Sequence, residues 1–162
     1  MNTKNLTQLA TAFRSGIENA ISDKALTTIA QGTTLLYFPT GCCGLVSDLL
    51  AQYLLDHGIN TYCVQGEYDF DDYENRFPHT WLETDDGCII DITADQFSHN
   101  PVFRNYHLTP CYVGKHNSFY DLFNEGIRSD GKFTGLRSFN SLYSNKVLSL
   151  YSIIFQYIPD SD

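Results

Sequence analysis

The hydrophobic residues near the start of the chain recur at helical spacing. Residues 5–22 carry their apolar side chains at Leu6, Leu9, Ala10, Phe13, Ile17 and Ile21. This spacing predicts an amphipathic helix with one buried face. A second helix is predicted over about residues 43–57, because apolar residues form two stripes along it and Gly58 suits the position just past a helix end. Two stripes predict a helix that is buried on several sides.

The segments that follow the second helix are typical of β-strands. Alternating patterns and runs of β-branched and aromatic residues predict strands at 59–67, 79–84, 88–93 and 111–113. Asp85-Asp86-Gly87, between the second and third of these, indicates a hairpin turn. Two helices followed by consecutive strands predict an α+β fold, in which the central helix packs on an antiparallel sheet.

The remaining segments have weaker patterns. Residues 32–40 are expected to be extended, and the acidic stretch DFDDYEN at 69–75 is expected to be an exposed loop. Residues 118–127 are predicted to form a short helix, and residues 143–158 a final helix or strand.

The length of the chain suits one domain. Its 162 residues contain no internal repeat, low-complexity tract or linker. We therefore predict a single domain over residues 1–162, with a helical N-terminal segment at 1–30, a core that carries the candidate chemistry at about 31–113, and a variable C-terminal segment at 114–162. A chain of this size buries enough surface to fold without a disulfide or a metal.

The charge balance argues against two classes of partner. The formal net charge is −9, whereas binding to a phosphate backbone or to an anionic membrane depends on clustered Lys and Arg. The N-terminus shows no signal-peptide pattern, and no apolar run approaches the ~18 residues that span a bilayer. The five cysteines are odd in number and lack a disulfide-rich spacing. We therefore expect a cytoplasmic protein that binds neither nucleic acid nor membrane.

Two adjacent cysteines stand in the stretch FPTGCCGLVSD (38–48). A disulfide between them would be strained, and no Cys-x-x-Cys spacing indicates a metal site, although Cys42, Cys43 and one histidine could assemble one through space. Most cysteines are small buried core residues. Cys43, however, lies at the predicted start of a helix, where unpaired N–H groups stabilise a thiolate. Gly41 and Gly44 flank the pair and allow a substrate to approach the backbone closely.

A nucleophilic cysteine needs a base and an orienting group, and the predicted hairpin carries both residue types. If residues 85–87 form a three-residue loop, Thr84 faces Cys88 across the hairpin. Asp91 then becomes a diagonal neighbour of His79 on the same sheet face, within reach of a hydrogen bond. A two-residue loop would instead place Asp91 on the opposite face. The sequence is therefore compatible with a nucleophile, a base and an orienting carboxylate at one site.

Three segments resemble the Cys, His and Asp motifs of the papain-like and transglutaminase-like cysteine enzymes: FPTGCCGLVSDLLAQYL, HTWLE and GCIIDITADQF. They are most similar to small bacterial proteins with FPxGxC, HxWLE and DITADQF motifs. The resemblance covers about residues 38–97 and implies a central helix with the nucleophile, packed on an antiparallel sheet with His and Asp. By position it implies Cys43 as the nucleophile, His79 as the base and Asp91 as the orienting carboxylate.

The chain departs from this pattern at two points. The residue before the nucleophile is usually small, whereas here it is Cys42. The glutamine that helps to hold the oxyanion in papain-type enzymes has no clear counterpart, so Gln31, Gln96 and backbone N–H groups alone stay open as candidates. Ser47, one helical turn after Cys43, is expected to bond to the helix backbone or to fill a tight contact rather than to react.

These features predict a thiol enzyme that acts on an amide or acyl group through a thioester, without a metal or cofactor. The expected substrate is a peptide or protein, and the expected reaction is that of a peptidase, an amidase or a glutamine deamidase. Transfer of the acyl group to an amine, as in transglutaminases, is the alternative. A non-catalytic peptide-binding module on the same fold, and a metal- or redox-linked sensor that uses Cys42 and Cys43, are the rival classes.

Overall fold

The computed structural model describes residues 3–27, 32–69 and 76–159. In these ranges the α-helices are α1 (Thr3–Ser22), α2 (Cys43–Asp56) and α3 (Ser141–Gln156). The strands are β1 (Tyr62–Asp69), β2 (Arg76–Glu83), β3 (Ile89–Asp91), β4 (Tyr112–Gly114) and β5 (Asn124–Arg128). The strands form one antiparallel sheet in the order β4-β3-β2-β1-β5. The predicted α+β class is therefore confirmed.

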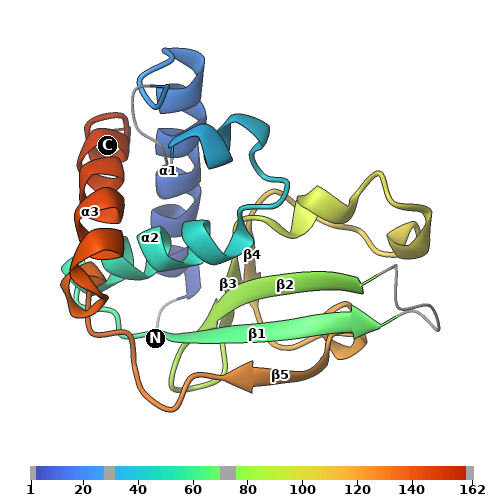
Figure 1. Ribbon diagram of the computed structural model, residues 1–162. Coiled ribbons are helices and arrows are strands. Elements are labelled where there is room, and N and C mark those ends of the chain that lie inside the picture. Colours follow the sequence, from blue (N-terminus) through green and yellow to red (C-terminus); the bar gives the residue numbers. More distant parts are fainter. Residues whose placement is uncertain (1–2, 28–31, 70–75, 160–162) are drawn as a thin grey trace.

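The sheet has helices on one face and an aromatic layer on the other. Figure 1 shows the three helices gathered on one side of the sheet. The alternation of side chains along β2 and β3 separates the two layers: Leu82 and Ile90 join the core under the helices, whereas Trp81 and Ile89 face the opposite side. On that side, an aromatic core is built mainly from Trp81, Phe97, Phe103, Phe119, Tyr120 and Phe123.

The first two predicted helices are confirmed. α1 buries the predicted apolar face, with Phe13 and Ile17 fully enclosed. α2 buries side chains around much of its circumference between Val46 and Leu54, as its two apolar stripes predict. It packs on β2, while α1 and α3 pack against each other. The N-terminus of α2 is thereby fixed beside the sheet.

α2 ends in a Schellman motif at the predicted glycine. Gly58 has a φ of +75°; its N–H donates to the carbonyl of Leu55, and the N–H of Ile59 donates to the carbonyl of Leu54, both at 2.9 Å. Glycine adopts this positive φ without steric cost. Because Ile59 completes the helix end, β1 begins at Tyr62 rather than at the predicted residue 59.

The turn between β2 and β3 has the predicted three-residue register. Gly87 adopts a φ of +70°, and the N–H of Thr84 donates to the carbonyl of Cys88 at 3.0 Å. The two strands pair accordingly. This register places His79 and Asp91 on the aromatic face of the sheet, close enough for a direct hydrogen bond.

Two predictions in the weakly patterned segments are wrong. Residues 32–40 are not extended, because a 3₁₀ helix, η1 (Gly32–Tyr37), carries the buried Leu35 into the core under the helices. Residues 118–127 do not form a helix; one 3₁₀ turn, η4 (Tyr120–Leu122), leads directly into β5. β5 pairs with β1, about sixty residues earlier in the chain, and such long-range pairing leaves little local signal.

The predictions for the other weakly patterned segments agree better with the structure. The strand predicted at 111–113 is β4, one residue further along, and the segment predicted as a final helix or strand is helix α3. Residues 70–75 of the predicted acidic loop lie outside the described residues. None of the helices in the described ranges has both the length and the hydropathy needed to cross a membrane.

Gly66 in β1 is required by packing. A Cβ atom at this position would lie 2.6 Å from the Cβ of Phe123 and 3.2 Å from the ring of Trp81, both of which are buried. We expect Gly66→Ala to lower the free energy of unfolding by about 1–3 kcal/mol, because the added methyl group overpacks the aromatic core. Gly131→Ala is the matched control, since a Cβ there meets nothing within 4 Å. Urea denaturation measures the free energy of unfolding of both variants. If Gly66→Ala were as stable as Gly131→Ala, the close packing around Gly66 would be contradicted.

Candidate active site

Cys43 is the first residue of α2, and Cys42 is its N-cap residue. The N–H of Val46 donates to the carbonyl of Cys42 at 2.9 Å, which starts the hydrogen-bond ladder of the helix. The N–H groups of residues 43–45 therefore have no acceptor within the helix. Together with the helix dipole, these N–H groups favour a negative charge on Cys43.

The two neighbouring thiols lie in opposite environments. The Cys42 thiol donates to the carbonyl of Pro39 at 3.3 Å and packs in the core under the helices, where the residue is 2% exposed. Burial and the adjacent Cys43 raise the pKa of Cys42 to about 12. Burial also acts to raise the pKa of Cys43, but the hydrogen bond and charge of His79 and hydrogen bonds with Thr80 outweigh it and lower this pKa below its usual value. The Cys42 side chain therefore turns into the protein.

His79 connects the thiol to the carboxylate of Asp91. Its Nε2 lies 2.6 Å from Oδ2 of Asp91, and both side chains are almost completely buried. Because the ionised carboxylate only accepts hydrogen bonds, Nε2 carries the ring proton and Nδ1 is the acceptor of the neutral ring. Burial lowers the pKa of His79, but the charge of Asp91 and hydrogen bonds to Asp91 and Cys43 outweigh it and raise the pKa to about 9. The structure thus brings Cys43, His79 and Asp91 together.

Asp91 is held by four hydrogen-bond donors. Oδ1 accepts from the N–H and the hydroxyl of Thr93, at 2.8 and 3.1 Å, and Oδ2 accepts from His79 and from the hydroxyl of Tyr120, the latter at 3.0 Å. Burial raises the pKa of Asp91, but the charge of His79 and these hydrogen bonds outweigh it and hold the pKa below its usual value. The carboxylate is therefore ionised and fixed in orientation.

Sequence analysis missed both Thr93 and Tyr120. The contact of Thr93 with Asp91 has a local sequence signal, because an Asp side chain often accepts a hydrogen bond from the residue two positions later. Tyr120 lies 29 residues after Asp91 and belongs to a segment that was predicted as a helix. No local pattern connects it to the hairpin.

The imidazole of His79 is surrounded by aromatic rings. Its centroid lies 5.2 Å from those of Phe97 and Phe123, 5.7 Å from that of Trp81 and 6.1 Å from that of Phe119. These rings shield the hydrogen bond between the imidazole and the carboxylate from water. In such a low-dielectric environment, the attraction between an imidazolium and a carboxylate is stronger than in water.

Of the two candidate oxyanion glutamines, Gln96 lies at the site. Its Nε2 is 3.2 Å from Nδ1 of His79, and its Oε1 accepts from the N–H of Gly41 at 3.4 Å. Gln31 lies outside the described residues. Ser47 donates to the carbonyl of Thr80 at 3.3 Å, so it fills a contact between α2 and β2, which is one of its two expected roles.

The segment that carries Gln96 is clamped to α1 by a buried arginine. Arg14 is 8% exposed and forms a bidentate ion pair with Asp95, with both N–O distances at 2.8 Å. It also donates to the carbonyls of Ile92 and Pro110, at 2.8 and 2.7 Å. Asp95 is therefore bound by Arg14, and Asp91 is the carboxylate that contacts the imidazole.

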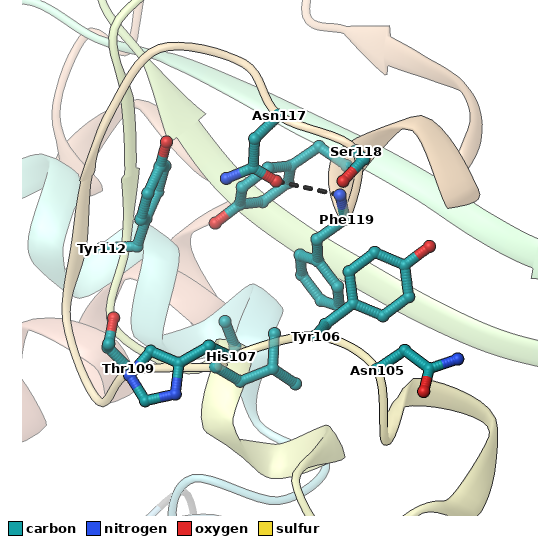
Figure 2. Close-up of a pocket in the computed structure, with 11 residues that line it drawn as sticks. Asn105, Tyr106, His107, Thr109, Tyr112, Asn117, Ser118 and Phe119 are labelled. Atoms are coloured by element: carbon teal, nitrogen blue, oxygen red, sulfur yellow. Dashed lines mark hydrogen bonds between the residues drawn. The ribbon is translucent and has the colours of Figure 1, made fainter.

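A separate pocket of about 250 Å³ is lined in part by Tyr120. Figure 2 shows residues of segment 105–109 and segment 117–120 on opposite sides of this pocket, with the N–H of Phe119 donating to Asn117 Oδ1. Tyr120 belongs both to this pocket and to the donors that hold Asp91. Neither Cys43 nor His79 lines the pocket, so it is distinct from the space in front of the thiol.

Neither a metal cluster nor a disulfide is found in the described ranges. No group of three or more His, Cys, Asp or Glu side chains there is arranged to hold a metal ion. The five cysteines, all of which lie within these ranges, are free thiols.

Comparisons with known proteins give two distant relatives of undescribed activity. No family model and no solved structure matches the chain. The chain is 36% identical over 98 residues to the uncharacterized protein YuaU of Escherichia coli K12, and equally to its counterpart in strain UTI89. The matched region is 60% of this chain and 44% of the relatives, so the chain spans less than half the length of the curated proteins that it matches.

Proposed function

We propose that this protein is a thiol enzyme that acts on an amide or acyl group of a peptide or protein, on a papain-like or transglutaminase-like fold. One observation carries the proposal: a partly exposed cysteine at the start of a helix pairs with a histidine whose other nitrogen is held by a buried carboxylate. A thiol, a base and an orienting group in this arrangement support nucleophilic catalysis.

The chemistry follows from the roles of these groups. Cys43 Sγ attacks the carbonyl carbon as a thiolate, and the proton of the thiol resides on Nδ1 of His79. When the carbon–nitrogen bond breaks, His79 gives that proton to the leaving amine, and the acyl group stays on Cys43 as a thioester. Asp91 holds the imidazole in the required tautomer and stabilises its charged form. Backbone N–H groups at the start of α2 are the candidate donors to the oxyanion.

The second half of the reaction decides the enzyme class. Water would release an acid, which is hydrolysis of a peptide bond or deamidation of a glutamine, whereas an amine would give acyl transfer. The non-catalytic binding module stays the rival proposal, because a cleft can bind a peptide without reacting with it. The cytoplasmic location expected from the sequence also stays a prediction.

One experiment separates these classes. N,N-dimethylated casein, whose own amines are blocked, is incubated with the protein and with fluorescent monodansylcadaverine. New amino termini report peptide hydrolysis. Ammonia release reports attack on a glutamine side chain, which is transfer where the fluorescent amine is incorporated in equal amount and deamidation where ammonia exceeds it. We expect at least one product that disappears in Cys43→Ala. A protein whose thiol is unreactive and which forms none of the three products would favour the binding module.

A further inference from the structure

The resting site contains a carboxamide from its own chain. The backbone N–H of Gly41 points at one end of the Gln96 carboxamide, 3.4 Å from the Gly41 nitrogen. Because an N–H donates to an oxygen, this end is Oε1. The amide nitrogen of Gln96 therefore faces Nδ1 of His79, at 3.2 Å. Gln96 thus bridges the loop before Cys43 and the base of the candidate site.

This bridge uses the hydrogen-bond acceptor that the thiol also needs. With Nε2 donating to Asp91, the neutral imidazole has one lone pair, on Nδ1. The N–H of Gln96 and the S–H of Cys43 therefore compete for a single acceptor. Once the thiol proton has moved to Nδ1, two N–H donors face each other there, which is unfavourable. In its observed position, Gln96 favours the neutral form of the Cys43–His79 pair.

The backbone around Gln96 is fixed, but its side chain can move. Asp95 is held by Arg14, and Phe97 is 6% exposed within the aromatic core. Gln96 itself is only partly buried. Rotation of its side chain between staggered conformers is therefore enough to vacate the position.

We infer that Gln96 is a positioning residue that occupies the amide-binding position of the resting site and restrains proton transfer from Cys43 to Nδ1 of His79 until an incoming amide displaces it. The inference rests on the proposed function, because an amide substrate would place its carbonyl oxygen near the N–H groups before α2 and its leaving nitrogen near His79. The carboxamide of Gln96 already has this orientation, with its oxygen on Gly41 and its nitrogen on His79.

The test is the pH profile of iodoacetamide alkylation at Cys43 in two variants. Gln96→Met removes both hydrogen-bonding groups at similar length, and Gln96→Asn keeps the amide but withdraws it by one methylene group. Loss of one competing hydrogen bond is expected to raise the alkylation rate at pH 6 by about two- to tenfold and to move the midpoint of the profile to lower pH. Gln156→Met, an exposed change on α3, is the matched control and should leave the profile unchanged.

The outcomes separate this inference from the proposed function. If Cys43 is reactive in the wild-type protein but both folded Gln96 variants keep its pH profile or react more slowly, Gln96 does not restrain the pair and the inference is overturned. If Cys43 behaves as an ordinary thiol in the wild-type protein and in both Gln96 variants, the proposed function fails, and the inference fails with it.

Discussion

Replacing His79 with glutamine is expected to turn Cys43 into an ordinary thiol. The new amide can still donate to Asp91, but it has no nitrogen that titrates near neutral pH. The pKa of the thiol would return towards the ~8.5 of a free cysteine, so only about 0.3% of it would be thiolate at pH 6. A thiolate of higher pKa is intrinsically more nucleophilic, which offsets part of this loss. We therefore expect alkylation by iodoacetamide to slow at least about tenfold.

The control for this variant is a histidine outside the site. His116→Gln changes an exposed residue and should leave the alkylation rate of Cys43 unaltered. Circular dichroism establishes that both variants are folded. A folded His79→Gln protein that reacts within about twofold of the wild-type rate would show that His79 does not activate Cys43.

Replacing Arg14 with methionine is expected to cause the largest loss of stability. Arg14 bonds Asp95 and two backbone carbonyls from a buried position. Methionine would fill much of the same space but leave these acceptors without a donor. Breaking a buried ion pair by removing one partner costs about 3–5 kcal/mol, and urea denaturation would measure this loss.

Glu18 provides a matched control on the same arginine. Its carboxylate pairs with Arg14 at 2.8 Å, but the Glu18 side chain is 51% exposed. Exposed ion pairs contribute about 0–1 kcal/mol, so Glu18→Gln should have little effect. Equal losses in the two variants would mean that the pairing of Arg14 with Asp95 does not stabilise the fold.

The candidate site could be predicted from the sequence where its geometry depends on local chemistry. The Asp85-Asp86-Gly87 turn determines which residues of β2 and β3 face each other, and that register places His79 beside Asp91. The apolar pattern of α2 likewise places Cys43 at a helix start. In both cases the relevant contacts lie within a few residues of the signal.

The supporting residues could not be predicted in this way. Arg14 stands beside the apolar Phe13 in α1, and its partner Asp95 is 81 residues further along the chain. A charged residue on a helix is usually at the surface, so the sequence does not indicate its burial. Tyr120 reaches Asp91 only because β5 returns to pair with β1 and closes the aromatic face of the sheet.

The central claim is that Cys43, and not Cys42, is a thiol activated by His79. Iodoacetamide labelling between pH 5 and 9, with the label located by peptide mass spectrometry, tests it most directly. The account predicts that at pH 6 the label falls on Cys43, whose pKa is lowered, while Cys42, with a pKa of about 12, stays unlabelled. Labelling of Cys42 in preference to Cys43, or slow labelling of both that rises only as pH approaches the ~8.5 of a free thiol, would contradict it.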